Sequence, residues 1–95
     1  MKVLALEKEL PGTTAEQFLP LLKDEAGCVW ELQQAGRLRE IYFDANQHTA
    51  VLVLECSDVE EAGGLLATLP LVQAGLITFD LIPLVPYDGF ARLFA

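Results

Sequence analysis

Three side chains in the sequence are candidates for acid–base catalysis: Glu25, Glu55 and His48. Glu25 falls on the apolar side of a helix predicted over residues 14–35, close to Phe18 on a helical wheel. Burial there would raise the pKa of the carboxyl group and suit it to proton transfer; alternatively, the carboxylate reaches solvent or pairs with an arginine. His48 is the only histidine, a residue type whose ordinary pKa lies near neutrality, although a histidine beside a turn is commonly exposed.

A second group of charged residues is a candidate substrate-binding site. Asp80 alternates with apolar residues in a predicted strand, so it faces away from the helices, and parity favours the same side for Glu55 and Glu7. The expected strand order brings Glu55 and Asp80 near one end of the sheet, with Arg37 or Arg39 close by. These residues form either a satisfied charge cluster or an anion site, where an arginine grips a substrate carboxylate in bidentate fashion.

Aromatic residues complete the candidate set. We expect Tyr42 to lie with Glu7 and His48 at the opposite end of the sheet, and Trp30 to border the apolar side of the helix. Trp30 is suited either to interface packing or to stacking on a bound ring. No metal motif, phosphate loop, dinucleotide fingerprint or nucleophile elbow is present, so no cofactor and no metal are expected. Cys28 and Cys56 are interpreted as small apolar core residues.

Length and composition limit the classes of protein to which the chain can belong. Its 95 residues predict a single domain over residues 1–95. Six basic against 14 acidic residues give a net charge of −8, which argues against nucleic-acid binding. There is no apolar run long enough for a membrane span, and the charges that begin at Glu7 leave no room for a signal peptide, so a cytoplasmic protein is expected. Hydrophobic residues make up 53% of this short chain, which predicts an apolar surface covered by a second subunit.

The elements that must position these residues follow from hydrophobic periodicity and turn signals. Strands are predicted over residues 2–8, 37–44, 48–56 and 76–84, with a hairpin turn across 45–47. The helix over 14–35 begins at a capping box of Thr13 and Glu16, bends at Pro20 and ends at Gly36. A second helix begins at a capping box of Ser57 and Glu60 and extends to about residue 69, where Pro70 ends it.

The order β-α-β-β-α-β predicts an α+β fold of the ferredoxin-like βαββαβ type. In this fold a four-stranded antiparallel sheet carries two helices on one face, and the first and third strands are central. Both central strands are apolar on both sides, so a second copy is expected on the open face. The tail is also apolar, and we expect it to pack on a neighbouring surface through Tyr87, Phe90, Leu93 and Phe94.

Three segments carry a resemblance to a known family: Val29 to Phe43, His48 to Ala62 and Thr68 to Leu84. In these segments and in its element order the chain resembles the muconolactone isomerase-like family of the ferredoxin-like dimeric α+β barrel superfamily. The resemblance implies a homodimer in which two sheets face each other, with further assembly up to a decamer. It also implies cofactor-free proton transfer on a small ligand, a lactone of aromatic catabolism. No catalytic motif is carried over with it.

Three functional hypotheses follow from these observations. The first is an isomerase in which a carboxylate or His48 moves a proton on a small unsaturated lactone or carbonyl acid, while an arginine holds the substrate carboxylate and stabilises enolate charge. The second is a cofactor-free monooxygenase or cyclase, because related barrels host those activities. The third is a non-catalytic ligand-binding or oligomerisation module, which predicts that every buried acid is paired and that no pocket remains inside the barrel.

Overall fold

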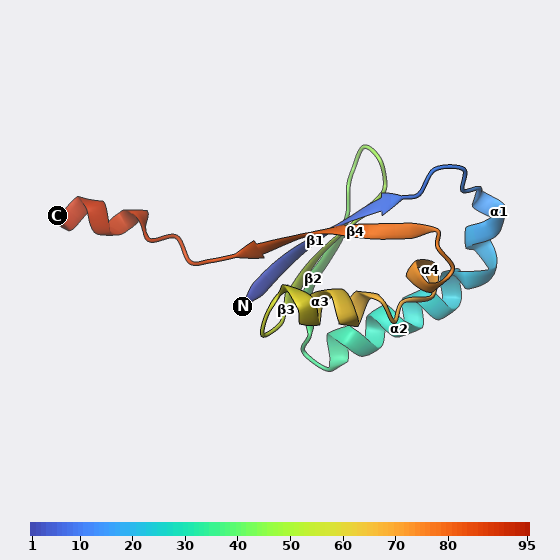
Figure 1. Ribbon diagram of the computed structural model, residues 1–95, viewed down its shortest axis with the longest axis horizontal. Coiled ribbons are helices and arrows are strands. Elements are labelled where there is room, and N and C mark those ends of the chain that lie inside the picture. The colour runs from blue at the N-terminus through green and yellow to red at the C-terminus, as the bar shows by residue number, and fades with distance from the viewer.

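The computed structural model describes residues 1–95 as a twisted antiparallel sheet with helices on one face (Figure 1). The strands are β1 (Lys2–Glu9), β2 (Leu38–Phe43), β3 (Ala50–Glu55) and β4 (Ile77–Leu84). Their order in the sheet is β2-β3-β1-β4, and every neighbouring pair is antiparallel. The predicted strand order, with β1 and β3 central, is therefore confirmed, and so is the ferredoxin-like fold.

The predicted long helix is divided where proline interrupts it. The chain forms α1 (Ala15–Phe18), a 3-10 turn η1 (Leu19–Leu21) and then α2 (Leu22–Gln34). Pro20 lies in the 3-10 turn, because proline has no N–H group to donate within an α-helix. The expected bend is confirmed. After β3 the chain forms α3 (Val59–Leu66) and a short α4 (Pro70–Gln73), so Pro70 begins a helix and does not simply end one.

Both predicted helix caps are shifted by one residue. Thr14, not Thr13, is the cap of α1, and Gln17 completes the box by accepting the N–H of Thr14 at 2.8 Å. Asp58, not Ser57, caps α3 by accepting the backbone N–H of Glu61 at 2.8 Å. In each case the capping residue is the one that keeps an extended backbone immediately before the first helical turn.

The Asp58 cap gives a direct test of the boundary of α3. Replacing Asp58 with alanine is expected to lower the free energy of unfolding by about 1 kcal/mol, since one amide of the first turn loses its acceptor. Urea denaturation followed by circular dichroism measures the change. Asp88→Ala is the matched control, because Asp88 precedes a 3-10 turn without capping it by a side-chain hydrogen bond. Equal losses in the two variants would contradict the assigned cap.

The core lies between the helices and one face of the sheet. Val3 and Ala5 of β1 and Leu52 and Leu54 of β3 are fully or almost fully buried against the helical layer. Cys56 belongs to the same cluster, and Cys28 packs against it, which confirms their interpretation as apolar core residues. The helices contribute Ala62, Leu66 and Leu69.

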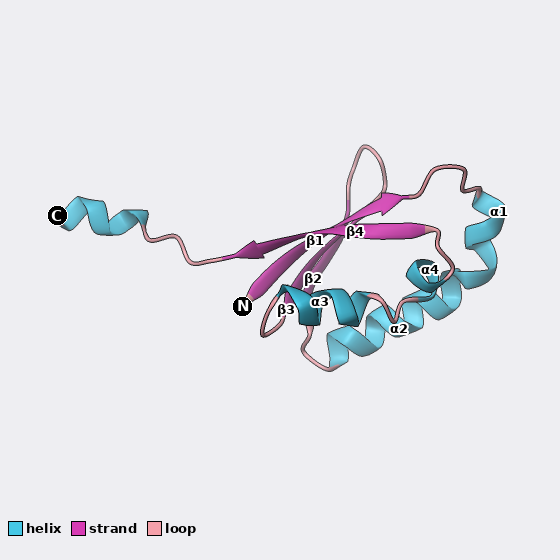
Figure 2. Cartoon of the chain, viewed as in Figure 1, coloured by secondary structure: helices cyan, strands magenta, loops and turns pink.

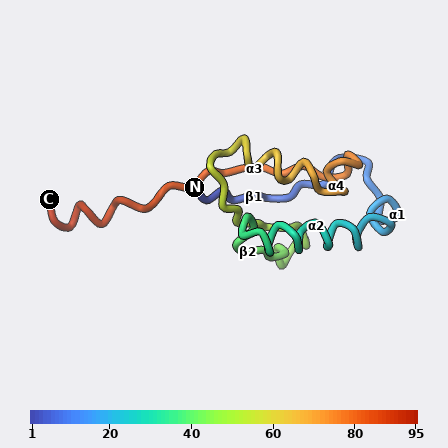
Figure 3. Tube along the Cα trace, turned by 90° about the horizontal axis from the view of Figure 1, so that it is seen from below, coloured from blue at the N-terminus to red at the C-terminus, as the bar shows by residue number.

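The other face of the sheet has no helix over it (Figure 2), whereas α2 and α3 lie over the face seen from below in Figure 3. The strand registers place a continuous set of apolar side chains on this open face, namely Leu4, Leu6, Val51, Val53, Ile82 and Leu84. On the edge strand β4, the large aliphatic side chains Ile82 and Leu84 are 41% and 39% exposed and extend this apolar surface. The open face is therefore an apolar surface without a cover in the single chain.

Residues 85–95 form an arm that leaves the sheet at the end of β4 and extends away from the body (Figure 1). The arm ends in a 3-10 segment, η2 (Gly89–Phe94), and its Val85 and Phe94 are 80% and 87% exposed. Within the arm the rings of Tyr87 and Phe90 make an edge-to-face contact with centroids 4.9 Å apart. The packing of the arm on a neighbouring surface stays a prediction. None of the helices has the length and apolar character needed to cross a membrane.

Candidate functional site

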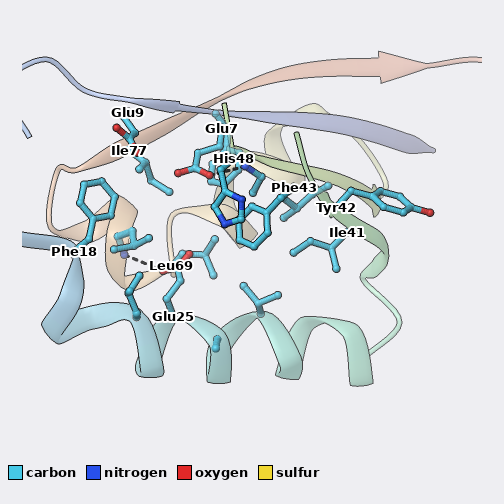
Figure 4. Close-up of a pocket in the computed structure, with 17 residues that line it drawn as sticks. Glu7, Glu9, Phe18, Glu25, Ile41, Tyr42, Phe43, His48, Leu69 and Ile77 are labelled. Atoms are coloured by element: carbon cyan, nitrogen blue, oxygen red, sulfur yellow. Dashed lines mark hydrogen bonds between the residues drawn. The ribbon is translucent and has the colours of Figure 1, made fainter. Parts of the chain in front are cut away.

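A cavity of about 660 Å³ opens between α2 and the helix-facing side of the sheet (Figure 4). It lies at the end of the sheet where β1 ends and β4 begins. Of its 17 lining residues 13 are hydrophobic, so any carboxylate within it sits in poorly solvating surroundings. The hydrophobic members include the aromatic residues Phe18, Tyr42, Phe43 and Phe79, and the four other lining residues are Glu7, Glu9, Glu25 and His48.

Glu25 projects from α2 into this cavity and is half-buried. One carboxylate oxygen accepts the backbone N–H of Leu71, at the start of α4, at 3.0 Å. Burial raises the pKa of Glu25 above its ordinary value, the nearby charge of Glu7 raises it further, and the hydrogen bond from Leu71 opposes the shift. No arginine or lysine pairs with Glu25. The apolar side of the helix therefore does place an acid in a desolvated site.

Glu7 is the cavity residue whose orientation was predicted wrongly. It was expected on the open face, but it shares the helix-facing side of β1 with Val3 and Ala5. One of its carboxylate oxygens accepts the backbone N–H of Ala50 at 2.6 Å, which compensates part of the cost of turning an acid inward. Residues 3, 5 and 7 share one face of the strand, but both faces of β1 are apolar, so alternation alone does not identify the face that packs on the helices.

His48 lines the cavity from the β2–β3 hairpin, although its side chain stays exposed. The hairpin loop is longer than predicted, and β3 begins at Ala50 and not at His48. Asp44 holds the loop by accepting the backbone N–H groups of Asn46 and Gln47. His48 has a left-handed backbone, with φ of 57°, and its ring stacks on Phe43 with centroids 4.0 Å apart.

Glu55 and Asp80 do not meet, which corrects the predicted cluster. In the strand registers Glu55 lies opposite Lys2, whereas Asp80 lies opposite Leu6, well along β1. Both point to the open face as expected. Glu55 pairs with the terminal amino group of Met1 at 2.9 Å, and this hydrogen bond lowers the pKa of its carboxyl. Asp80 pairs with Lys8 at 2.6 Å. Neither acid lines the cavity.

The two candidate arginines also lie away from the cavity. Arg37, just before β2, forms an ion pair with Glu61 at the start of α3. Arg39 occupies the bulge where the register of β2 shifts between Leu38 and Glu40, and its side chain is exposed. The predicted anion-binding end is thus not part of this cavity, and no lysine or arginine lines its wall.

Tyr42 and Trp30 contribute little to the cavity interior. The Tyr42 hydroxyl donates to Glu40 at 2.9 Å, and its ring points away from the cavity (Figure 4). That hydrogen bond raises the pKa of the Tyr42 hydroxyl. Trp30 is 60% exposed on α2 and does not belong to the lining. No group of three or more His, Cys, Asp or Glu side chains is arranged to hold a metal ion.

Four antiparallel strands in this order, with the helices on one face, define a ferredoxin-like α+β protein with a cavity between its two layers. Comparison with solved structures identifies particular proteins that share this fold. The chain is similar to muconolactone isomerase, with a TM-score of 0.76 and 21% identity over 93% of this chain and 92% of that one.

A second similar structure is 5-chloro-2-hydroxyhydroquinone dehydrochlorinase from Burkholderia phenoliruptrix, in complex with 2,5-dihydroxybenzoquinone. Its TM-score is 0.70 at 14% identity, over 94% of this chain and 98% of that one. No protein-family model and no curated protein matches the sequence. The resemblance predicted from the three sequence segments is therefore confirmed at the level of the fold.

Proposed function

We propose that this protein catalyses cofactor-independent proton transfer, an isomerisation, on a small unsaturated lactone or related carbonyl compound bound in the cavity. The observation that carries the proposal is Glu25, a half-buried carboxyl group of raised pKa in an apolar cavity. A carboxylate of raised pKa is a stronger base than an exposed glutamate, which is what removal of a proton next to a carbonyl requires. Similarity of fold to muconolactone isomerase supports this class of reaction.

The arrangement of the two acids suits movement of a proton between two positions of one ring. Glu7 enters from the sheet and Glu25 from α2, on opposite walls of the cavity (Figure 4). Each acid is held by a backbone N–H group through one oxygen, which leaves the other oxygen free. In the proposed step Glu25 accepts the α-proton to give an enolate and then returns a proton to the far end of the conjugated system, which regenerates its carboxylate, while the free oxygen of Glu7 accepts a hydrogen bond from the substrate.

The hypothesis of a non-catalytic module is less well supported by the same geometry. It requires every buried acid to be paired, yet neither Glu7 nor Glu25 forms a salt bridge.

We also propose that the protein is a homodimer, in which the open faces of two sheets pack together and the arms dock on neighbouring subunits. Its two unpaired cysteines fit a reducing compartment, so the proposed location is the cytoplasm.

Isomerisation of an uncharged β,γ-unsaturated lactone tests the proposed reaction. The purified protein is mixed with α-angelica lactone in D₂O, and proton NMR follows formation of the conjugated isomer and deuterium incorporation. We expect isomerisation well above the buffer rate, lost in Glu25→Gln and kept in Glu31→Gln, which alters an exposed acid of the same helix. If neither this lactone nor hydroxybenzoquinone shows deuterium incorporation that depends on Glu25, the proposed function is contradicted.

A further inference from the structure

The charges around the cavity are all of one sign, and this restricts what the cavity can bind. Glu7 and Glu25 face its interior and Glu9 lies at its rim (Figure 4). His48 is the only lining residue that can carry a positive charge. A ligand carboxylate would thus be placed among carboxylates in a medium that screens charge poorly.

The basic residues of the chain are all located elsewhere. Lys8 is paired with Asp80 on the open face, and Arg37 is paired with Glu61 beside α3. The remaining four lie outside the cavity lining, on β1, on α2, at the bulge of β2 and in the arm: Lys2, Lys23, Arg39 and Arg92. A carboxylate in this cavity therefore has no arginine or lysine of its own subunit to bind.

The polar groups that do face the cavity are hydrogen-bond acceptors. After their bonds to Ala50 and Leu71, Glu7 and Glu25 each keep a carboxylate oxygen that can accept a further hydrogen bond. A hydroxyl group supplies the single donor that each oxygen needs. The stacked rings of Phe43 and His48 offer a flat surface, and Phe18 and Phe79 add further aromatic side chains to the wall. These groups match a hydroxylated ring.

We infer that the cavity selects an uncharged, hydroxyl-bearing ring and rejects the same ring carrying a carboxylate, because its two inward-facing glutamates have no cationic partner. The inference rests on the proposed function in placing the substrate in this cavity, and it narrows the substrate class. It replaces the earlier expectation of an arginine-bound carbonyl acid. Binding tests it without any turnover, so failure of the isomerase assay leaves the inference standing.

Hydroquinone and gentisate form a matched pair of probes, since gentisate is hydroquinone with one added carboxylate. Isothermal titration calorimetry of the full chain at neutral pH measures both affinities. We expect gentisate to bind at least about tenfold more weakly than hydroquinone. In Glu7→Gln and Glu25→Gln the gap between the affinities for hydroquinone and gentisate narrows, because each substitution removes one repelling charge. Each glutamine keeps an oxygen that accepts the same backbone N–H group. Glu31→Gln is the control and leaves the gap unchanged.

Two results with the unmodified protein would overturn the inference. One is gentisate binding as tightly as hydroquinone to the unmodified protein, and the other is no binding of hydroquinone at millimolar concentration. If gentisate binds tightly and Arg92→Ala abolishes this, the cation comes from the arm of another subunit. If gentisate binds weakly but the gap is unchanged in both glutamine variants, repulsion by these acids is not the cause, and the inference fails in its stated mechanism.

Discussion

Replacing Glu25 with glutamine is expected to lower turnover roughly a hundredfold to ten-thousandfold, the range typical of the loss of a positioned general base. The amide keeps the shape of the side chain, and its oxygen can still accept the Leu71 N–H, so α2 and α4 stay in place. Steady-state rates with the lactone substrate measure the effect. The comparison variant is Glu31→Gln, which changes the net charge equally on the exposed side of α2. Turnover within threefold of the unmodified protein would exclude Glu25 as the base.

The same substitution is expected to change how stability depends on pH. Burial raises the pKa of Glu25 in the folded state above its value of 4.5 in the unfolded chain. The folded protein thus binds the Glu25 proton more tightly than the unfolded chain, and this contribution to stability is complete below the unfolded pKa. It is lost as the pH rises through the folded pKa. The free energy of unfolding of Glu25→Gln, compared with that of the unmodified protein at the same pH, therefore increases as the pH rises from acidic to neutral. Urea denaturation at several pH values measures this difference.

Placing a charge in the centre of the open face is expected to dissociate the proposed homodimer. Val53 lies in the middle of this face, directly opposite Leu4 of β1 and pointing away from the helices. In a dimer of facing sheets, Val53→Glu would bury two unpaired carboxylates, which costs several kcal/mol. Because about 1.4 kcal/mol is a factor of ten, association is expected to weaken at least a hundredfold.

Native mass spectrometry and size-exclusion chromatography at micromolar concentration measure this change. Gln33→Glu serves as the control, because it adds the same charge at an exposed position of α2. The far-ultraviolet circular dichroism of Val53→Glu should match that of the unmodified protein, since Val53 lies outside the helix–sheet core. If the variant keeps the mass of the unmodified assembly, subunits do not associate through the open face.

The sequence was sufficient to predict the fold because its hydrophobic pattern is unambiguous. Residues 3–6 and 51–54 are apolar on both sides, which only central strands require, and the bend at Pro20 follows from a missing N–H group. Cap positions were less predictable. Neighbouring threonines and a Ser-Asp pair offer two caps each, and the backbone conformation that decides between them is set by tertiary packing.

The candidate site was predicted only in part, because the positions of its charged side chains depend on the strand register and on the distance between the helices and the sheet. Glu25 follows from the helical wheel alone. Glu7 was placed on the wrong face because an inward acid was judged too costly, and the sequence shows neither the cavity nor the Ala50 N–H that solvates it. Glu55 and Asp80 were separated by a register that element order does not fix.

The left-handed backbone of His48 lowers the stability of the hairpin, whereas the side chain that it carries places a ring at the cavity rim. A left-handed conformation costs a residue other than glycine about 1 kcal/mol, whereas glycine adopts it freely. A glycine here would leave the turn relaxed and remove both the stacking partner of Phe43 and the only imidazole of the chain. At this residue a more stable loop would lack the side chain that lines the cavity rim, so selection of variants for thermal stability alone would tend to remove the only imidazole of the cavity.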